Sequence, residues 1–150
     1  MLSYLVVQQV YDLPEDILEL SRAAAEEDFK PIRWLIDEWD NESNRFSLPG
    51  EALYEVRAGK RLVGICGLNR DPFRKGEKLG RLRRLYIHPE FRRKGIGRQL
   101  VMKATGDATN EFEAIRLMTL DDESAKFFEA VGFHRVEGEE RVSHSISVDS

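Results

Sequence analysis

Residues 92–98 carry the clearest chemical signal in the sequence. They read Arg-Arg-Lys-Gly-Ile-Gly-Arg and place Gly95 and Gly97 between a predicted strand and a predicted helix. Glycine lets backbone N–H groups approach an anion closely, and the first turn of a helix adds a favourable dipole. The turn is therefore predicted to hold a pyrophosphate. It is not a P-loop, because Gly-Lys-Ser/Thr is missing, nor a dinucleotide-binding fingerprint, because Leu100 replaces the third glycine.

The charge distribution favours one local anion site. The 150-residue chain has a formal net charge of −4, yet residues 61–100 hold 12 basic and 3 acidic residues, a net charge of +9. The flanking segments, 1–60 and 101–150, carry −7 and −6. Because acidic flanks would repel a polyphosphate backbone, we expect no nucleic-acid partner. Taken alone, the basic stretch is equally consistent with a solvated surface that binds nothing.

Length and composition indicate a single domain over residues 1–150. No apolar run approaches the ~20 residues of a membrane span, and residues 1–10 do not resemble a signal peptide. We therefore expect a cytoplasmic protein without a membrane partner. Cys66 is the only cysteine, and the three histidines lack ligand spacing, so no disulfide and no metal site are expected.

Hydrophobic periodicity predicts an α/β (α+β) fold, with one largely antiparallel sheet flanked by helices. The expected strands cover residues 4–10, 53–58, 62–68, 81–88 and 114–120, followed by a hairpin around Gly138. The expected helices carry Ile17 to Ala24, Pro31 to Trp39, the residues after Gly95, and Ser124 to Val131. This order places the basic turn between the fourth strand and the third helix.

Two motifs in this setting resemble the GCN5-related N-acetyltransferase (GNAT) superfamily. Residues 85–97, LYIHPEFRRKGIG, look like the motif Arg/Gln-x-x-Gly-x-Gly/Ala that follows a strand ending in an aliphatic-x-Pro sequence. Residues 127–133, FFEAVGF, resemble the motif Phe/Leu-Tyr-Glu-x-x-Gly-Phe about 30 residues further on. The resemblance implies a single GNAT-like domain. Its mixed, mostly antiparallel sheet would have about seven strands, flanked by about four helices, with the fourth and fifth strands splayed apart.

The resemblance also implies acetyl-CoA as a co-substrate, with no metal. Its pantetheine arm would lie between the splayed strands and pair with backbone groups of Leu85, Tyr86 and Ile87. Amides from Arg93 to Arg98 would hold the pyrophosphate, and Asp121 and Phe128 stand at two further family positions. The implied cofactor-binding set is Leu85, Tyr86, Ile87, Arg92, Arg93, Lys94, Gly95, Ile96, Gly97, Arg98, Asp121 and Phe128.

The implied reaction is direct transfer of the acetyl group to a primary amine in a ternary complex. A backbone N–H near the end of the fourth strand would stabilise the oxyanion. The usual acid of the family, a tyrosine, is replaced by Phe128, and arginines stand at both usual base positions, Arg81 and Arg116. The candidate catalytic residues are therefore Tyr86, His88 and Glu55, beside a relay through backbone carbonyls and water.

The acceptor amine is the least determined part of the prediction. Phe29, Trp34 and Glu38 are the candidate substrate-binding residues, because acidic groups and aromatic rings attract an ammonium group. Conversely, Arg81, Arg83 and Arg84 could bind a carboxylate on the acceptor. A small amine, an amino-acid-like compound and a peptide or protein amine all stay open.

Two other functions remain as alternatives to an enzyme. One is a non-catalytic acyl-CoA-binding regulatory module that has lost its acid and base, and the other is a nucleotide or nucleic-acid binder. A homodimer is possible by family resemblance. Cys66 and His144 are interpreted as core residues, the histidine with hydrogen-bond partners.

Overall fold

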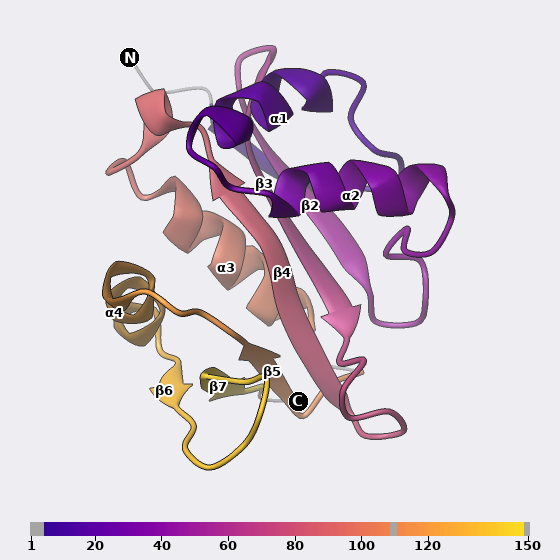
Figure 1. Ribbon diagram of the computed structural model, residues 1–150, viewed down its shortest axis with the longest axis vertical. Coiled ribbons are helices and arrows are strands. Elements are labelled where there is room, and N and C mark those ends of the chain that lie inside the picture. The colour runs from indigo at the N-terminus through magenta and orange to yellow at the C-terminus, as the bar shows by residue number, and fades with distance from the viewer. Residues whose placement is uncertain (1–4, 109–110, 149–150) are drawn as a thin grey trace.

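The chain folds into one seven-stranded mixed sheet with helices on both faces (Figure 1). The computed structural model describes residues 5–108 and 111–148. The sheet order is β1-β2-β3-β4-β5-β7-β6, and the β4–β5 pair is parallel. In chain order the elements are β1 (Leu5–Val10), α1 (Ile17–Glu26), α2 (Pro31–Asp40), β2 (Ala52–Ala58), β3 (Arg61–Arg70), β4 (Leu79–Ile87), the 3-10 turn η1 (Pro89–Phe91), α3 (Ile96–Asp107), β5 (Ala114–Leu117), α4 (Asp122–Ala130), β6 (His134–Arg135) and β7 (His144–Ser147).

The two faces of the sheet are covered by different helix pairs (Figure 1). On one face, α1 and α2 bury residues at helical spacing, such as Ile17, Leu20 and Leu35, against Ile65 and its neighbours. On the other face, α3 and α4 pack against the opposite side chains of the same strands. Both sides of β2 and β3 are therefore buried, which explains why residues 62–68 of β3 are apolar without interruption.

The fourth and fifth strands part after a short parallel pairing, as the resemblance implies. Register pairs run only from Leu79 with Ala114 to Arg81 with Arg116. Beyond that point β4 continues to Ile87, whereas β5 ends at Leu117. Figure 1 shows β4 running on past β5 toward the turn that leads into α3. The separation leaves one edge of β4 without a neighbouring strand among the described residues.

A β-bulge interrupts β4 where the two strands part. Ile65 pairs with Tyr86 and Gly67 pairs with Arg83, so Cys66 stands opposite two residues, Arg84 and Leu85. Arg84 takes a left-handed backbone conformation, with φ 60°. A bulge inserts one residue and reverses the alternation of side chains beyond it.

The predicted order of strands and helices is confirmed. Gly59, with φ 61°, forms the β2–β3 turn. The fifth strand is shorter than predicted, because the chain leaves the sheet after Leu117 to reach α4. The predicted first residue of β1, Tyr4, lies outside the described residues. None of the described helices is long and apolar enough to cross a membrane.

Candidate functional site

The turn before α3 presents a row of free amides. Arg93 and Gly95 both have positive φ, 63° and 79°. Within the described residues, the N–H groups from Arg93 to Arg98 have no hydrogen-bond acceptor, and the first α3 amide with one is that of Gln99, which donates to the Gly95 carbonyl at 3.1 Å. Left-handed residues beside a helix start turn successive N–H groups toward one point. This arrangement can bind a phosphate or pyrophosphate.

The two glycines of the turn serve different purposes. A Cβ at Gly95 would meet no atom within 4 Å, so glycine is needed there for its positive φ. A Cβ at Gly97 would lie 3.2 Å from Cζ of Phe127, so glycine is needed there for close packing of α3 against α4. Local conformation and tertiary packing therefore both fix the start of α3.

The basic side chains of the turn divide into two groups. Arg93, Lys94 and Arg98 are exposed and form no ion pair with any described residue. Arg92 instead pairs with Glu27, which follows α1, through Nη1 and Nη2 at 2.7 and 2.6 Å. Its Nε also donates to the Ile87 carbonyl at 3.0 Å. Three cations are thus free to meet phosphate oxygens, and Arg92 ties the turn to the rest of the fold.

Tyr86 and Arg92 both donate hydrogen bonds to Glu27. The Tyr86 ring stacks on Phe29 at 5.3 Å between centroids, and the Arg92 guanidinium lies 5.3 Å from the centre of the Tyr86 ring. Burial, followed by the contact with Glu27, raises the pKa of the Tyr86 phenol. The phenol therefore stays protonated at neutral pH and can donate a proton rather than accept one.

The other two catalytic candidates lie further from the bulge. His88 is three residues beyond Leu85, about 10 Å along the strand, and its Nδ1 accepts from the Glu90 amide at 3.2 Å. Glu55 is in register with Ile65 and hence with Tyr86, two strands away, or about 10 Å across the sheet. It is buried and accepts hydrogen bonds from Gln8 at 2.6 Å and Arg57 at 3.0 Å.

Two predicted cofactor-binding residues have structural contacts on α4. Asp121 caps the helix, because its Oδ1 accepts from the Ser124 amide at 2.7 Å. Phe128 is buried against Phe127 and Phe133 at 5.0 and 5.6 Å between ring centroids. Phe128 is therefore a core residue. Contact of either residue with a cofactor stays a prediction.

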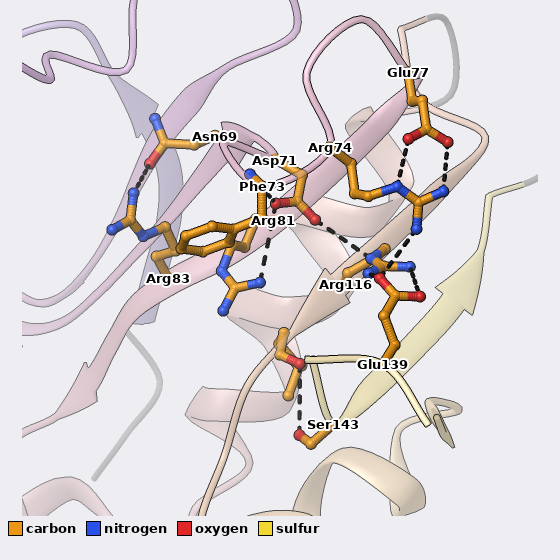
Figure 2. Close-up of polar contacts among 11 residues, drawn as sticks. Asn69, Asp71, Phe73, Arg74, Glu77, Arg81, Arg83, Arg116, Glu139 and Ser143 are labelled. Atoms are coloured by element: carbon orange, nitrogen blue, oxygen red, sulfur yellow. Dashed lines mark hydrogen bonds and ion pairs between the residues drawn. The ribbon is translucent and has the colours of Figure 1, made fainter. Parts of the chain in front are cut away.

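Arginines at the two usual base positions meet at one buried carboxylate (Figure 2). Arg81 and Arg116 are register partners, and each is 8% exposed. Asp71, whose side chain is fully buried, lies 3.3 Å from Arg116 Nε and 4.0 Å from Arg81 Nη1. Glu139 also pairs with Arg116 and, at 3.0 Å, with Arg74. The network links the β3–β4 connection to β5 and to the connection before β7.

The predicted acceptor residues fall in two places on the α2 side of the sheet. Phe29 stacks on Tyr86, as described above. Glu38 pairs with Arg84 at 2.7 Å, and the Trp34 ring centre lies 5.6 Å from the same guanidinium. The structure thus brings the predicted acidic and aromatic residues of α2 onto the arginine of the bulge. Their contact with an acceptor stays a prediction.

Sequence reasoning did not single out two residues that organise the site. Glu27 lies in an acidic stretch expected only to attract an amine acceptor, yet it joins Tyr86 and Arg92. Asp71 follows β3 in an Arg-Asp-Pro turn, and nothing local shows that it lies between two arginines. The excess of arginines in β4 was the one available sign that buried counter-ions were needed.

His144 and Cys66, the remaining residues that could bind a metal or react, are core residues. His144 is 1% exposed and contacts Ser143 at 2.9 Å and Glu129 at 2.8 Å, which confirms its core interpretation. Cys66 is buried, as expected. Within residues 5–108 and 111–148, no group of three or more His, Cys, Asp or Glu side chains is placed to hold a metal ion.

Comparison with known proteins agrees with this geometry. The model of the acetyltransferase (GNAT) family matches residues 9–133. No curated protein sequence matches the chain significantly.

Solved structures share the fold at low sequence identity. A protein from Exiguobacterium sp. 255-15 has a TM-score of 0.84 at 23% identity, covering 96% of this chain and 93% of its own. A GNAT-family acetyltransferase from Staphylococcus aureus Mu50 has a TM-score of 0.69 at 18% identity, covering 96% and 100%. An acetyltransferase from Streptococcus agalactiae 2603 has a TM-score of 0.70 at 18% identity, covering 94% and 95%.

Proposed function

Because the chain belongs to the GNAT acetyltransferase family, we propose that it is an N-acetyltransferase that moves the acetyl group of acetyl-CoA to a primary amine. Family membership supports acyl transfer in general. The choice of acetyl-CoA, the amine acceptor and direct attack in a ternary complex are the proposal. The acceptor can be a small molecule, an amino-acid-like compound or a peptide or protein amine.

One observation carries the proposal. Six consecutive amides, from Arg93 to Arg98, are free of acceptors in the described structure, and they adjoin three exposed cations at the end of a strand whose edge is open. A pyrophosphate fits the amides and cations, and an extended amide-containing arm fits the open strand edge by β-type pairing. Coenzyme A combines both groups, whereas a nucleotide alone leaves the strand edge unused.

The chain's own groups then supply positioning and charge stabilisation. Acetyl-CoA supplies the activated thioester. Arg84 and Leu85, at the bulge, lie where a backbone N–H can donate to the carbonyl oxygen as the amine attacks. In the reaction a C–N bond forms, the C–S bond breaks, and the ammonium proton leaves through water. We assign Tyr86 as the donor that protonates the departing sulfur, because its phenol is neutral and it lies nearest the bulge among the three candidates; water then returns a proton to the phenolate.

Binding of acetyl-CoA, measured by calorimetry, tests the proposal first. Gly97→Glu should abolish saturable binding, since a side chain there collides with Phe127 and adds negative charge beside the amides. Gly106→Glu is the matched control in the same helix, because a Cβ there meets no atom within 4 Å. Dephospho-CoA should bind more weakly than CoA. Thermal melts of both variants show whether each is folded.

The outcomes separate the candidate functions. Binding that Gly97→Glu removes and Gly106→Glu preserves supports a coenzyme A site. Turnover of any amine then distinguishes the enzyme from a non-catalytic acyl-CoA-binding module, which Phe128, Arg81 and Arg116 would favour. Absence of acetyl-CoA binding by the wild-type protein would contradict both, and would point to another anion at the basic turn.

A further inference from the structure

Several cationic side chains of β4 lie on one face of the sheet, next to the bulge. Leu82 belongs to the core beneath α3, whereas Tyr86 belongs to the core beneath α1 and α2. The side chains of a regular strand alternate, so these two residues would share a face without the bulge. Arg81 and Arg83 lie on the α2 side because they alternate with Leu82, and the bulge brings Arg84 and Tyr86 to the same side. Three arginines within four residues therefore adjoin the position at which the acyl group would lie.

These arginines differ in their counter-ions. Arg81 lies beside Asp71, and Arg84 pairs with Glu38 at 2.7 Å. Arg83 forms no ion pair with any carboxylate of the described residues, and its one polar contact is Nη1 to Oδ1 of Asn69 at 3.4 Å. Figure 2 shows Arg83 apart from the ion pairs around Asp71, reaching only Asn69. Arginine keeps its charge inside proteins, so Arg83 is a half-buried cation without an ion pair of its own.

Asn69 is held so that it presents an oxygen to Arg83. Its Nδ2 donates to Asn44 Oδ1 at 2.9 Å and to Glu51 Oε2 at 3.0 Å. Both amide hydrogens are used, and Oδ1 accepts from Asn44 Nδ2 at 3.0 Å as well as from Arg83 Nη1 at 3.4 Å. Burial, followed by the neighbouring Arg84, lowers the pKa of the Arg83 guanidinium, and the more distant carboxylates of Glu38 and Asp71 offset this only in part. The site therefore contains an arginine with no carboxylate in direct contact, which leaves it able to bind an anion.

The missing anion does not belong to coenzyme A. The free amides begin at Arg93, beyond the far end of β4, and Arg83 lies about 13 Å before Ile87 along the strand. A phosphate held at the turn cannot also reach Arg83. A group next to the bulge on the α2 side belongs to the molecule that attacks the acyl carbon.

We propose that the acceptor is an amine that also carries a carboxylate, and that Arg83, flanked by Arg81 and Arg84, binds that carboxylate. The planar guanidinium donates two parallel hydrogen bonds to such a group. The anion neutralises Arg83 and sets the amine at a fixed distance from the bulge. This inference rests on the proposed acetyl transfer, and it narrows the acceptor to amino-acid-like compounds and acidic peptide ends.

Paired acceptors test the inference. Acetyl-CoA turnover is measured with the common L-amino acids and with the same compounds as α-carboxamides. Phosphoethanolamine and ethanolamine form a further pair that tests phosphate as the anion. We expect kcat/KM to favour the acid of at least one amino-acid pair by tenfold or more. Arg83→Gln should remove this preference and leave the Kd of acetyl-CoA unchanged. Arg33→Gln, on the exposed face of α2, is the matched control and should change neither.

Other results overturn the inference. They are equal rates for acids and amides, a preference confined to phosphoethanolamine, or a preference that survives Arg83→Gln. If no amine is acetylated, we measure binding of the N-acetylated acids and of their amides to the protein–CoA complex. Absence of a preference for the acids contradicts the inference. Failure of acetyl-CoA itself to bind contradicts the proposed function instead. The anion site is then judged by acid binding to the free protein.

A stability measurement separates a binding role from a structural one. Replacing an arginine that supports the fold lowers the stability of the protein. Arg83 has no counter-ion among the described residues, and its charge is repelled by that of Arg84. Arg83→Gln should therefore keep or raise the Tm. A marked fall in Tm would show that Arg83 supports the fold instead.

Discussion

Tyr86 connects the chemistry of the site to its packing. Its hydroxyl contacts Glu27, its ring stacks on Phe29, and its phenol has a raised pKa because it is buried. The phenol is therefore protonated at neutral pH and carries the proton that a departing thiolate would take up. It is a poor base, so removal of the ammonium proton falls to water and backbone carbonyls.

We expect Tyr86→Phe to lower kcat about tenfold to a hundredfold, the low end for a general acid, because a thiolate leaves readily without one. The Kd of acetyl-CoA should not change. The shape of the pH–rate profile below about pH 9 should also persist, because the phenol does not titrate there. Tyr11→Phe, at an 80% exposed residue, is the control. An unchanged kcat would assign Tyr86 a positioning role only.

The α1–α2 connection is joined to the end of β4 and to the basic turn through one carboxylate. Glu27 accepts from Arg92 and from Tyr86, and these hydrogen bonds, that of Arg92 first, hold its pKa below the ordinary value of 4.5. A carboxyl with a lowered folded pKa stabilises the protein above its unfolded pKa. That contribution is lost as the pH falls through the folded pKa. The stability of this junction should therefore weaken in acid.

Glu27→Gln should lower the free energy of unfolding by less than about 1 kcal/mol at neutral pH, because solvent screens a carboxylate that is 36% exposed. The difference from the wild type should shrink as the pH falls below about 4.5, because Glu27 is protonated first in the unfolded chain and then, at its lower pKa, in the folded protein. Urea unfolding at neutral and acidic pH measures it. Glu26→Gln, at the exposed neighbouring residue, is the control. A difference that grows in acid would contradict the assignment.

The molecule as a whole protects its single thiol. Cys66 lies on β3 beneath α3, and burial raises the pKa of its thiol to about 12. A thiol in this state does not react directly, so any labelling reports opening of the central sheet. Because a ligand that binds only the folded state suppresses opening, Cys66 also reports cofactor binding.

We expect a thiol reagent to label the native protein at least about a thousandfold more slowly than the unfolded chain, in line with the stability of a domain this size. Saturating acetyl-CoA should slow labelling further, and Gly97→Glu should remove that effect. Labelling in denaturant provides the reference rate. Fast labelling of the native protein would show that the α3 face opens locally. Labelling that acetyl-CoA leaves unchanged would contradict binding at this turn.

The predicted dimer and the cytoplasmic location stay predictions. Both edges of β7 are occupied at His144 and Ser145, by β5 on one side and β6 on the other. A dimer that paired through these residues would first displace β6. The order of elements is consistent with either oligomeric state.

The sequence by itself determined the features that depend on neighbours along the chain. Alternation and helical spacing predicted the order of strands and helices, because these periods follow from local backbone geometry. The Arg92–Arg98 turn was likewise readable, since glycines, cations and a helix start are contiguous. The resemblance extended this to the splayed strands, which the register of β4 and β5 confirms.

Only the tertiary structure decided which distant charges meet. Glu27 and Arg92 are 65 residues apart, and Asp71 is 45 residues from Arg116. A one-residue bulge moved Arg84 and Tyr86 to the face that already held Arg83. Side-chain direction in a strand depends on register, and register is fixed by packing across the whole sheet rather than by adjacent residues. The unpaired state of Arg83 could therefore be seen only after every other counter-ion had been placed.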